Sequence, residues 1–493
     1  HPLVNSRCLL HCCLHSPSYR SLLPPPLLLF LVIFTHIVIN TVSCFSSSPQ
    51  LHLAFIHSFS SDIYHCCLFQ PQPLFFNNSC LAPSCDPTSL SSPPTLPRSS
   101  YSSPFMSKMS QTHPLDLHEI RSIIASSLGL KDLASCALVC QDWNDSFTPL
   151  LYNSVVLSKQ DSSMESVERN KHLIQRLKIQ GSGFEKLPST PARDKLIFSV
   201  MANSTLITLQ LHHNVIGDEG AQTLSDALKI NSTLTTLTLW DNSIGPNGVQ
   251  ALAEALVANS ALTTLALGYN SIGDNGAQAL SEAIKTNSTL TTLNLRLNSI
   301  GDNGAQMLSE ALKTNSTLIT LNLRYNWIGP NGAQALSEAL KINSTLITLH
   351  LEDNSIEPNG AQALSEALKI NSTLTTLTLG YSSIEDNGTQ ALSEALKINS
   401  TLTTLDLCSN SIGDNGVVAL SEALKTNTAL TTLVLGHNSI GDTGAQALSE
   451  ALKMNSTLTT LDLCSNSIGD NGAQAFKINS TVTIMGVRDF KTL

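Results

Sequence analysis

NSTLITLQLHHNVIGDEGAQTLSDALKI, residues 203–230, is the first of a series of 28-residue units that follow one another in strict register. Each unit begins with Asn followed by Ser or Thr, and the units start at residues 203, 231, 259, 287, 315, 343, 371, 399, 427 and 455. A fixed period of this length is typical of solenoids, in which each unit packs only against its neighbours. The sequence therefore predicts a repeat protein rather than a domain with one globular core.

Within each unit, a strand pattern is followed by a helix pattern. The motif Leu-x-x-Leu-x-Leu-x-x-Asn alternates with period 2, so that Leu209 and Leu211 point to the same side of a short strand. Leu224, Ala227 and Leu228 then recur at helical spacing and line one stripe of a helix. We expect these two apolar surfaces to pack against each other in every unit.

This pattern resembles the leucine-rich repeat, specifically the 28-residue type found in ribonuclease-inhibitor-like proteins. The resemblance implies an α/β solenoid shaped as a horseshoe, with parallel strands on the inside and helices on the outside. Ten repeats then occupy residues 203–478, the last of them shortened, and residues 479–493 form a C-terminal remnant in which a strand resumes at Val482. Residues 170–202 carry a degenerate strand and a helix with Pro191 in its first turn, which predicts an atypical capping repeat.

Two asparagine positions recur in the units. The first lies three residues after the second strand leucine and is Asn in nine repeats and Ser382 in the seventh; the asparagines are Asn214, Asn242, Asn270, Asn298, Asn326, Asn354, Asn410, Asn438 and Asn466. A buried amide there is expected to donate to and accept from the backbone of neighbouring turns. The second, at the start of each unit, forms an Asn-Ser-Thr sequon in eight of the ten units; we interpret these sequons as helix ends in left-handed geometry and not as glycan sites.

Composition limits the classes of function. Three of the 27 Lys and Arg and two of the 37 Asp and Glu precede Met106, so that from there on 24 basic residues face 35 acidic ones. This negative charge argues against binding of nucleic acid or anionic membranes. We find no nucleophile–base arrangement and no metal-ligand spacing, and therefore expect no catalytic residues, no metal and no cofactor. We expect a non-enzymatic protein of the cytoplasm or nucleus.

Residues 1–105 differ from the rest of the chain. They contain no Met, Lys, Glu, Gly or Trp but eight of the 12 cysteines, and Met106 is the first methionine. The favoured residues share pyrimidine-rich codons, so we interpret this region as an untranslated leader or a disordered segment. A signal or anchor segment is the alternative, because residues 27–34 are wholly apolar, although that run is short for a membrane span.

Residues 106–157 contain two short amphipathic helix patterns divided at Gly129. They resemble the F-box, a small helical motif that binds Skp-type adaptors of cullin ubiquitin ligases, although His118 stands where that family usually has Pro. The resemblance implies that the adaptor is contacted by Leu117, Glu119, Ile120, Ile124, Leu128, Leu133, Val139 and Trp143. Alternatively, the helices only cover the first repeat. Residues 158–169 are polar and are predicted to be a linker.

Recognition is expected where the repeats differ, just past each strand on the concave face. Aromatic and Arg side chains are frequent there in repeats two to five, as in protein-binding hot spots. We predict that a partner protein contacts Trp240, Tyr269, Arg296, Arg324, Tyr325, Glu352, Asp353 and Tyr381. Truncation of Arg324 or Tyr325 is expected to weaken binding with little loss of stability.

These observations favour a non-catalytic protein-binding scaffold, namely a substrate receptor of a Skp-cullin-F-box ubiquitin ligase that works as a monomer within a larger complex. One alternative is a small-GTPase regulator like the Ran GTPase-activating proteins, which have similar repeats but usually a long acidic tail. Another is a generic interaction protein. Repeats of this type also resemble those of NOD-like sensors, whose Gly-x4-Gly-Lys nucleotide loop is absent from this sequence.

Overall fold

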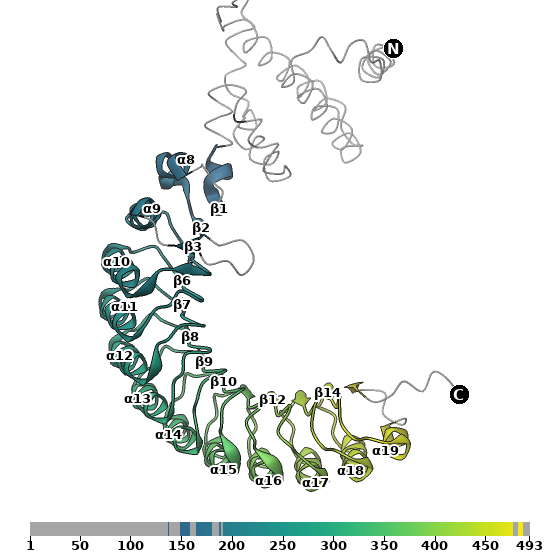
Figure 1. Cartoon of the computed structure of the whole chain (residues 1–493). Helices are drawn as coiled ribbons and strands as arrows, with labels where there is room; N and C mark the ends of the chain where they lie inside the picture. Colours follow the sequence, from purple (N-terminus) through teal and green to yellow (C-terminus); the bar gives the residue numbers. More distant parts are fainter. Residues whose placement is uncertain are drawn as a thin grey trace, which may run out of the picture. The chain divides into compact units, whose positions relative to one another are not determined.

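The computed structural model describes residue 137 and residues 148–157, 164–179, 187–188, 191–476 and 482–486. The chain divides into two compact units, residues 1–151 and 152–493. The second unit is a leucine-rich-repeat solenoid, which confirms the predicted α/β class, with parallel strands along the inside of an arc and helices along its outside (Figure 1). The F-box-like segment lies almost wholly outside the described residues.

Short parallel strands form the inner layer of the solenoid. The main sheet has the strand order β1-β2-β4-β6-β7-β8-β9-β10-β11-β12-β13-β14-β15 among the described residues. The strands are β1 (Ser154–Leu157), β2 (Arg176–Ile179), β4 (Thr208–Gln210), β6 (Thr236–Thr238), β7 (Thr264–Ala266), β8 (Thr292–Asn294), β9 (Thr320–Asn322), β10 (Thr348–His350), β11 (Thr376–Thr378), β12 (Thr404–Asp406), β13 (Thr432–Val434), β14 (Thr460–Asp462) and β15 (Thr483–Met485). A separate pair joins β3 (Leu187–Pro188) to β5 (Asn214–Val215).

Helices form the outer layer, one in each repeat. They are α8 (Met164–Arg169), η1 (Lys171–Leu173), α9 (Pro191–Met201), α10 (Gly217–Ile230), α11 (Pro246–Ala258), α12 (Gly273–Thr286), α13 (Asp302–Leu312), α14 (Pro330–Leu340), α15 (Glu357–Leu368), α16 (Glu385–Leu396), α17 (Asp414–Leu424), α18 (Asp442–Leu452) and α19 (Asp470–Ala475). Among the described residues, no helix is both long and apolar enough to cross a membrane.

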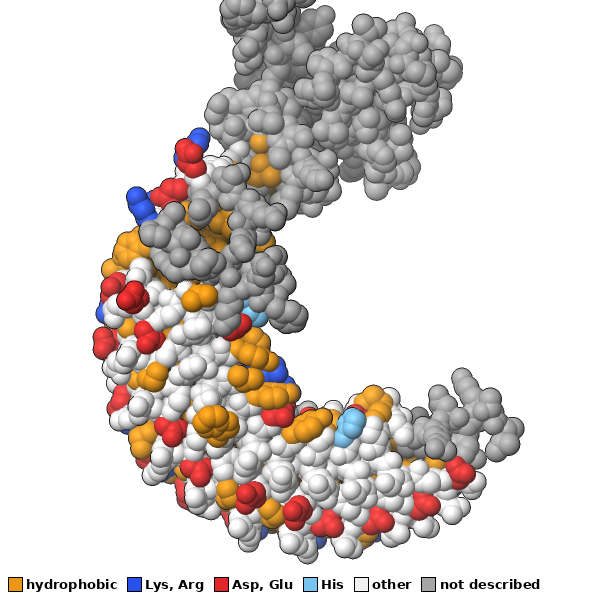
Figure 2. All heavy atoms as spheres, in the orientation of Figure 1, with side chains coloured by type: hydrophobic (Ala, Val, Ile, Leu, Met, Phe, Trp, Pro, Cys, Tyr) orange, Lys and Arg blue, Asp and Glu red, His pale blue; other side chains and the backbone are white. Residues whose placement is uncertain are grey.

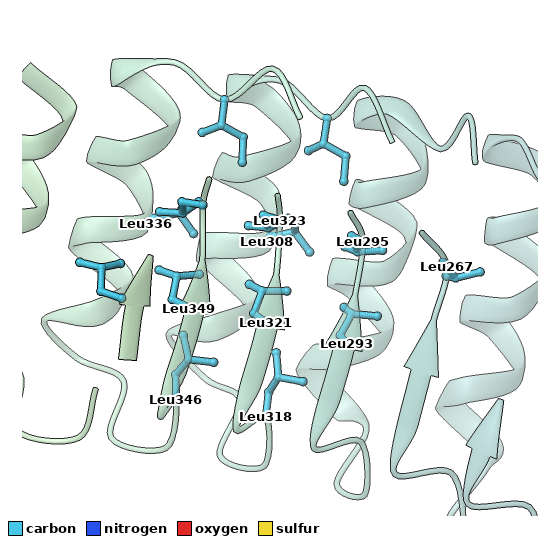
Figure 3. Packing of buried hydrophobic residues seen from close by; sticks show 14 of the residues in the cluster. Leu267, Leu293, Leu295, Leu308, Leu318, Leu321, Leu323, Leu336, Leu346 and Leu349 are labelled. Atoms are coloured by element: carbon cyan, nitrogen blue, oxygen red, sulfur yellow. The ribbon is translucent and has the colours of Figure 1, made fainter. Parts of the chain in front are cut away.

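The strand register follows the 28-residue period without a slip from β4 to β14. Thr208 pairs with Thr236, and the same threonine position pairs in every later strand up to Thr460. Because side chains alternate across a strand, this register turns the middle leucine of each strand into the core, while the residues on either side of it are half-buried on the opposite face, except Thr378, which is buried. Leu293, Leu321 and Leu349 accordingly form a row that faces Leu308 and Leu336 of the helices (Figure 3).

The ends of the solenoid differ from the predicted boundaries. The sheet begins at β1, inside the segment assigned to the F-box-like module, and the predicted linker contains α8, whose Val167 is buried in the core. Within this polar segment, the apolar side chain of Val167 holds the short helix on the core of the solenoid. The segment predicted to be a capping repeat contains β2, which pairs with β4, and α9; in the C-terminal remnant, β15 pairs with β14.

The first asparagine position forms the predicted ladder. Asn270 Oδ1 accepts hydrogen bonds from the backbone N–H groups of Asn242 and Ile244, each at 3.0 Å. Asn270 Nδ2 donates to the carbonyl oxygens of Leu239 and Leu267, each at 2.9 Å. Each amide thus satisfies buried backbone groups of its own repeat and of the preceding one, which a buried turn requires.

The asparagine at the start of each repeat has a different geometry from the one predicted. Asn287 follows α12 with φ −70° and ψ 129°, which is extended and not left-handed. Its Oδ1 accepts from the N–H groups of Thr289 and Leu290 at 3.0 and 2.8 Å, while its Nδ2 donates to the Leu256 carbonyl at 2.8 Å. The backbone can stay extended because the side chain closes the turn. The amide is buried and fully used, which supports the structural interpretation of the sequons.

Candidate functional site

Two columns of side chains follow the strands along the concave edge of the sheet. The first column consists of the residue directly after the second strand leucine of each repeat, from His212 to Cys464, and the second column consists of the next residue. The residue in the second column has a left-handed backbone, with φ between 52° and 57°. These residues are His213, Asp241, Tyr269, Leu297, Tyr325, Asp353, Tyr381, Ser409, His437 and Ser465. Each backbone N–H from His213 to His437 donates to a carbonyl of the next repeat, as from Asp241 to Gly268 at 3.0 Å. The hydrogen bonds hold the columns in line despite the unfavourable φ of these residues.

Large side chains of these columns meet in repeats one to five. His212, Trp240, Tyr269, Arg296 and Tyr325 form what we call the aromatic–arginine cluster. The rings of His212 and Trp240 stack with centroids 6.5 Å apart, and those of Trp240 and Tyr269 lie 5.5 Å apart. Arg296 Cζ lies 6.0 Å from the Trp240 ring centroid, 5.4 Å from that of Tyr269 and 4.4 Å from that of Tyr325. Three rings therefore surround one guanidinium at cation–π distance.

Gly268 makes room for this cluster. A Cβ atom at that position would lie 3.1 Å from Trp240 Cε2 and 3.3 Å from the Arg296 carbonyl oxygen. A side chain there would have to push the indole away, because the carbonyl belongs to the fixed backbone. Because repeat three has glycine at this position, the Trp240 ring of repeat two can lie against the end of the strand.

Arg296 differs from every other basic residue between residues 203 and 476. The nine others, from Lys229 to Lys453, each form an ion pair with Asp or Glu. The Arg296 side chain makes neither an ion pair nor a hydrogen bond with any described residue, and its Nε is buried without a partner. The cluster therefore carries an uncompensated positive charge.

A second group lies next to the cluster and is internally neutralised. Arg324 Nε lies 3.2 Å from Glu352 Oε2, although the two atoms lack the alignment of a hydrogen bond. The Glu352 side chain is only 5% exposed, and His350 Nδ1 lies 3.9 Å from the same oxygen and 3.0 Å from Thr378 Oγ1. Burial lowers the pKa of His350, and the nearby Glu352 carboxylate opposes that shift. Arg324 thus compensates a buried carboxylate and is not a free recognition group.

The predicted partner-binding residues divide accordingly. Trp240, Tyr269, Arg296 and Tyr325 come together; burial, followed by the charge of the Asp353 carboxylate, raises the pKa of Tyr325. Tyr381 is 53% exposed and has no ring contact with the cluster. The hydrophobic side chains on the inner side of the arc gather around a basic patch near its middle (Figure 2).

The predicted adaptor-binding residues, all between residues 117 and 143, lie outside the described residues. Two relevant side chains were not among the predicted sites. His212 extends the cluster, and its register with Trp240 in the same column could have indicated this. Burial, followed by the charge of Lys178, lowers the pKa of His212, which favours the neutral ring. Trp327 is 71% exposed at a turn position where eight repeats have Ser.

The described residues offer little for bond-making chemistry. They contain no group of three His, Cys, Asp or Glu side chains that could hold a metal ion. Burial and the Asp406 carboxylate raise the pKa of the Cys408 thiol to about 12, which leaves it protonated at neutral pH. A protonated thiol is a poor nucleophile. What the concave face does offer is a large, rigid contact surface.

Comparison with known proteins identifies the family. The model of the NLRC3 LRR domain matches residues 190–490, more than half of the chain. No curated protein matches. One matching solved structure is "Leiomodin-1 Actin-Binding Site 2 (ABS2)", 27% identical, with a TM-score of 0.21 and coverage of 22% of this chain and 67% of that chain. The chain therefore belongs to the NLRC3-type leucine-rich-repeat family, whose solenoid is a protein-interaction scaffold.

Proposed function

We propose that the solenoid binds a partner protein on its concave face, with the aromatic–arginine cluster at the centre of the interface. The observation that carries this proposal is the meeting of Trp240, Tyr269 and Tyr325 around Arg296. Trp, Tyr and Arg are the side chains most enriched among residues that dominate binding energy. Few other concave positions offer comparable side chains, since the later repeats present Ser409, Gly436 and similar small residues.

The rigidity of the cluster supports this function. Tyr269 and Tyr325 are each 37% exposed, so that part of every ring is available while the rest is fixed by contacts within the cluster. A partner that binds pre-ordered aromatic rings loses little side-chain entropy. The hydrogen-bonded columns beneath fix the spacing of the rings from one repeat to the next.

Affinity capture with the full chain tests this proposal. We expect that a Trp240→Ala, Tyr325→Ala double variant loses the proteins that the wild-type chain retains. The matched control is Ile370→Ala, which removes an apolar side chain that is 64% exposed on the helical layer. An unchanged set of bound proteins in the double variant places recognition on another surface.

We further propose that the chain acts as a substrate receptor of a Skp-cullin-F-box ubiquitin ligase. The support is the sequence pattern from Leu117 to Trp143, with Glu119-Ile120 and the Trp143 ending. Ile120→Asp in the full chain is expected to abolish binding of a purified Skp-type adaptor, because it places a charge in an apolar contact. Ile398→Asp, at an exposed position in the turn after α16, is the control. Equal adaptor binding by both variants leaves the helices with the role of a cap.

A further inference from the structure

Arg296 occupies the centre of a symmetric arrangement of side chains on the concave edge. The second column reads Asp241, Tyr269, Leu297, Tyr325 and Asp353 through repeats two to six. Arg296 precedes the middle residue of that series and contacts both tyrosines, at 5.4 and 4.4 Å from the ring centroids. Along the edge, Asp241 is therefore followed by the Tyr269 ring, the Arg296 cation of the first column, the Tyr325 ring and Asp353.

The guanidinium is prepared for an anion but has none. Its Nε is buried, the side chain makes no ion pair or hydrogen bond with a described residue, and Cζ lies at cation–π distance from the rings of Trp240, Tyr269 and Tyr325. Aromatic rings stack on the faces of a guanidinium and leave its N–H edge for hydrogen bonds in the plane. A carboxylate is planar and accepts two such bonds in parallel, which makes it the matching group for that edge.

We propose that Arg296 receives one side-chain carboxylate of the bound partner, from an Asp or Glu flanked by apolar residues. This inference rests on the proposed function and specifies what the concave face recognises. The flanking apolar residues contact Trp240, Tyr269 and Tyr325, while the carboxylate pairs with the guanidinium. An internal segment fits better than a chain terminus, because the second column continues on both sides of Arg296, to His213 in one direction and to Ser465 in the other.

The surrounding charges favour a single carboxylate over a phosphate or a run of acids. Asp353 and Asp241, whose Oδ2 lies 2.9 Å from His213 Nδ1, stand at the two ends of the tyrosine series, and the nearest other basic side chain along the columns, Arg324, already pairs with Glu352. A phosphate group at neutral pH carries a charge of about −1.5 to −2, so it would be repelled more strongly by these carboxylates than a carboxylate would. An acidic run would place its second charge next to Asp241 or Asp353.

Defined peptides test the proposal without a known partner. The probes are sets of short peptides, acetylated and amidated at their ends, with a central Glu between Leu, Phe or Val residues. Each peptide has two twins in which Gln or phosphoserine replaces the Glu. Dissociation constants are measured by fluorescence anisotropy for the full chain and for Arg296→Ala, Arg296→Lys and Lys285→Ala. Lys285 is the control, because it is a cation on a helix, paired with Glu282.

The expected result is that the tightest peptides contain Glu and bind about tenfold more tightly than their Gln twins, as for a charge-assisted bidentate pair. In Arg296→Ala this preference falls to less than about twofold, Arg296→Lys retains part of it, and Lys285→Ala matches the wild type. Chemical denaturation of the variants shows whether each is folded, and Arg296→Lys preserves the test if Arg296→Ala is not.

Three results overturn the proposal: no Glu preference or no binding in any set, a preference that persists in both Arg296 variants, or tighter binding of the phosphoserine twin that depends on Arg296. Failure of the proposed function is recognised separately. If one of these three results is found but Trp240→Ala, Tyr325→Ala still weakens binding of both the Glu peptides and their Gln twins, the cluster binds peptides and only the carboxylate assignment fails. If the double variant changes neither, the concave face is not the recognition surface.

Discussion

Asp274 caps the helix of the repeat that follows its own. Its Oδ1 accepts hydrogen bonds from the backbone N–H groups of Gly301 at 2.7 Å and Gly304 at 3.0 Å, at the start of α13. The same bond to a glycine of the next repeat is made by Asp218, Asp302, Asp386, Asp414 and Asp442. A carboxylate there satisfies unpaired N–H groups and interacts favourably with the helix dipole. The stability of each helix thus depends on the neighbouring repeat.

Helices that follow a repeat without this Asp begin differently. Pro246, Pro330 and Pro358 replace it, and the following turns then contain Gly273, Glu357 and Glu385 with φ between 57° and 59°. The N–H of each of these residues donates instead to a backbone carbonyl of the next repeat, as from Glu385 to Asn410 at 3.0 Å. Proline in place of this Asp therefore goes with a different turn in the next repeat. In two of the three cases, the residue in that turn is a glutamate with the left-handed backbone that favours glycine.

Removal of an inter-repeat cap is expected to destabilise the solenoid. Asp302→Ala should lower the free energy of unfolding by about 1–2 kcal/mol, because the N–H groups of Gly329 and Gly332 lose their acceptor. Asp470→Ala is the control, since Asp470 has the same local sequence but makes no side-chain hydrogen bond to a described residue. Urea denaturation monitored by circular dichroism compares the two. Equal losses would show that the cap contributes little.

Relief of backbone strain is expected to stabilise the protein. Glu385→Gly should raise the free energy of unfolding by about 0.5–1 kcal/mol. A left-handed backbone costs about 1–2 kcal/mol in a residue with a Cβ atom. Glycine avoids this cost but loses more backbone entropy on folding, so only part of the cost is recovered. Glu394→Gly removes the same charge from the interior of α16 and should destabilise by about 1 kcal/mol. The two variants should shift the denaturation midpoint in opposite directions, and shifts of the same sign contradict the argument.

The asparagine ladder predicts unequal effects at two equivalent positions. Asn326→Ala should destabilise by about 1–3 kcal/mol, because Asn326 accepts from the N–H groups of Asn298 and Ile300 and donates to the Leu295 carbonyl. Ser382→Asn should be neutral or stabilising, since Ser382 Oγ donates only to carbonyl groups. Chemical denaturation of both variants tests this, and a comparable loss in both would argue against the ladder as the source of stability.

The two concave arginines should differ in what their truncation costs. Arg324→Ala is expected to destabilise the fold by about 1–3 kcal/mol, because the Glu352 carboxylate stays buried without its cation. This differs from the prediction from sequence that stability would hardly change. Tyr325→Ala should leave stability nearly unchanged and weaken partner binding by about 2 kcal/mol or more. Denaturation and binding measured on both variants, with Ile370→Ala as an exposed control, separate these roles.

The sequence by itself determined the repeat, its strand and helix, and the asparagine ladder. These features use positions that recur every 28 residues, such as Leu293, Leu321 and Leu349, and each copy places them in the same local environment. Their contacts follow from periodicity alone, because a side chain at a fixed place in one unit meets the same place in the next. The same periodicity also predicts which side chains occupy the concave columns, including Trp240 and Tyr325.

Only the tertiary structure decided which variable side chains interact. Arg296 and Arg324 occupy the same position of adjacent repeats, yet one is surrounded by rings without a counter-ion and the other pairs with Glu352. The difference depends on which residues the neighbouring repeats present and on the direction in which each long side chain turns. Likewise, Asp274 lies in the first turn of its own helix by sequence, but its hydrogen bonds go to the next repeat, because the register of β7 with β8 brings the start of that helix within reach of its carboxylate.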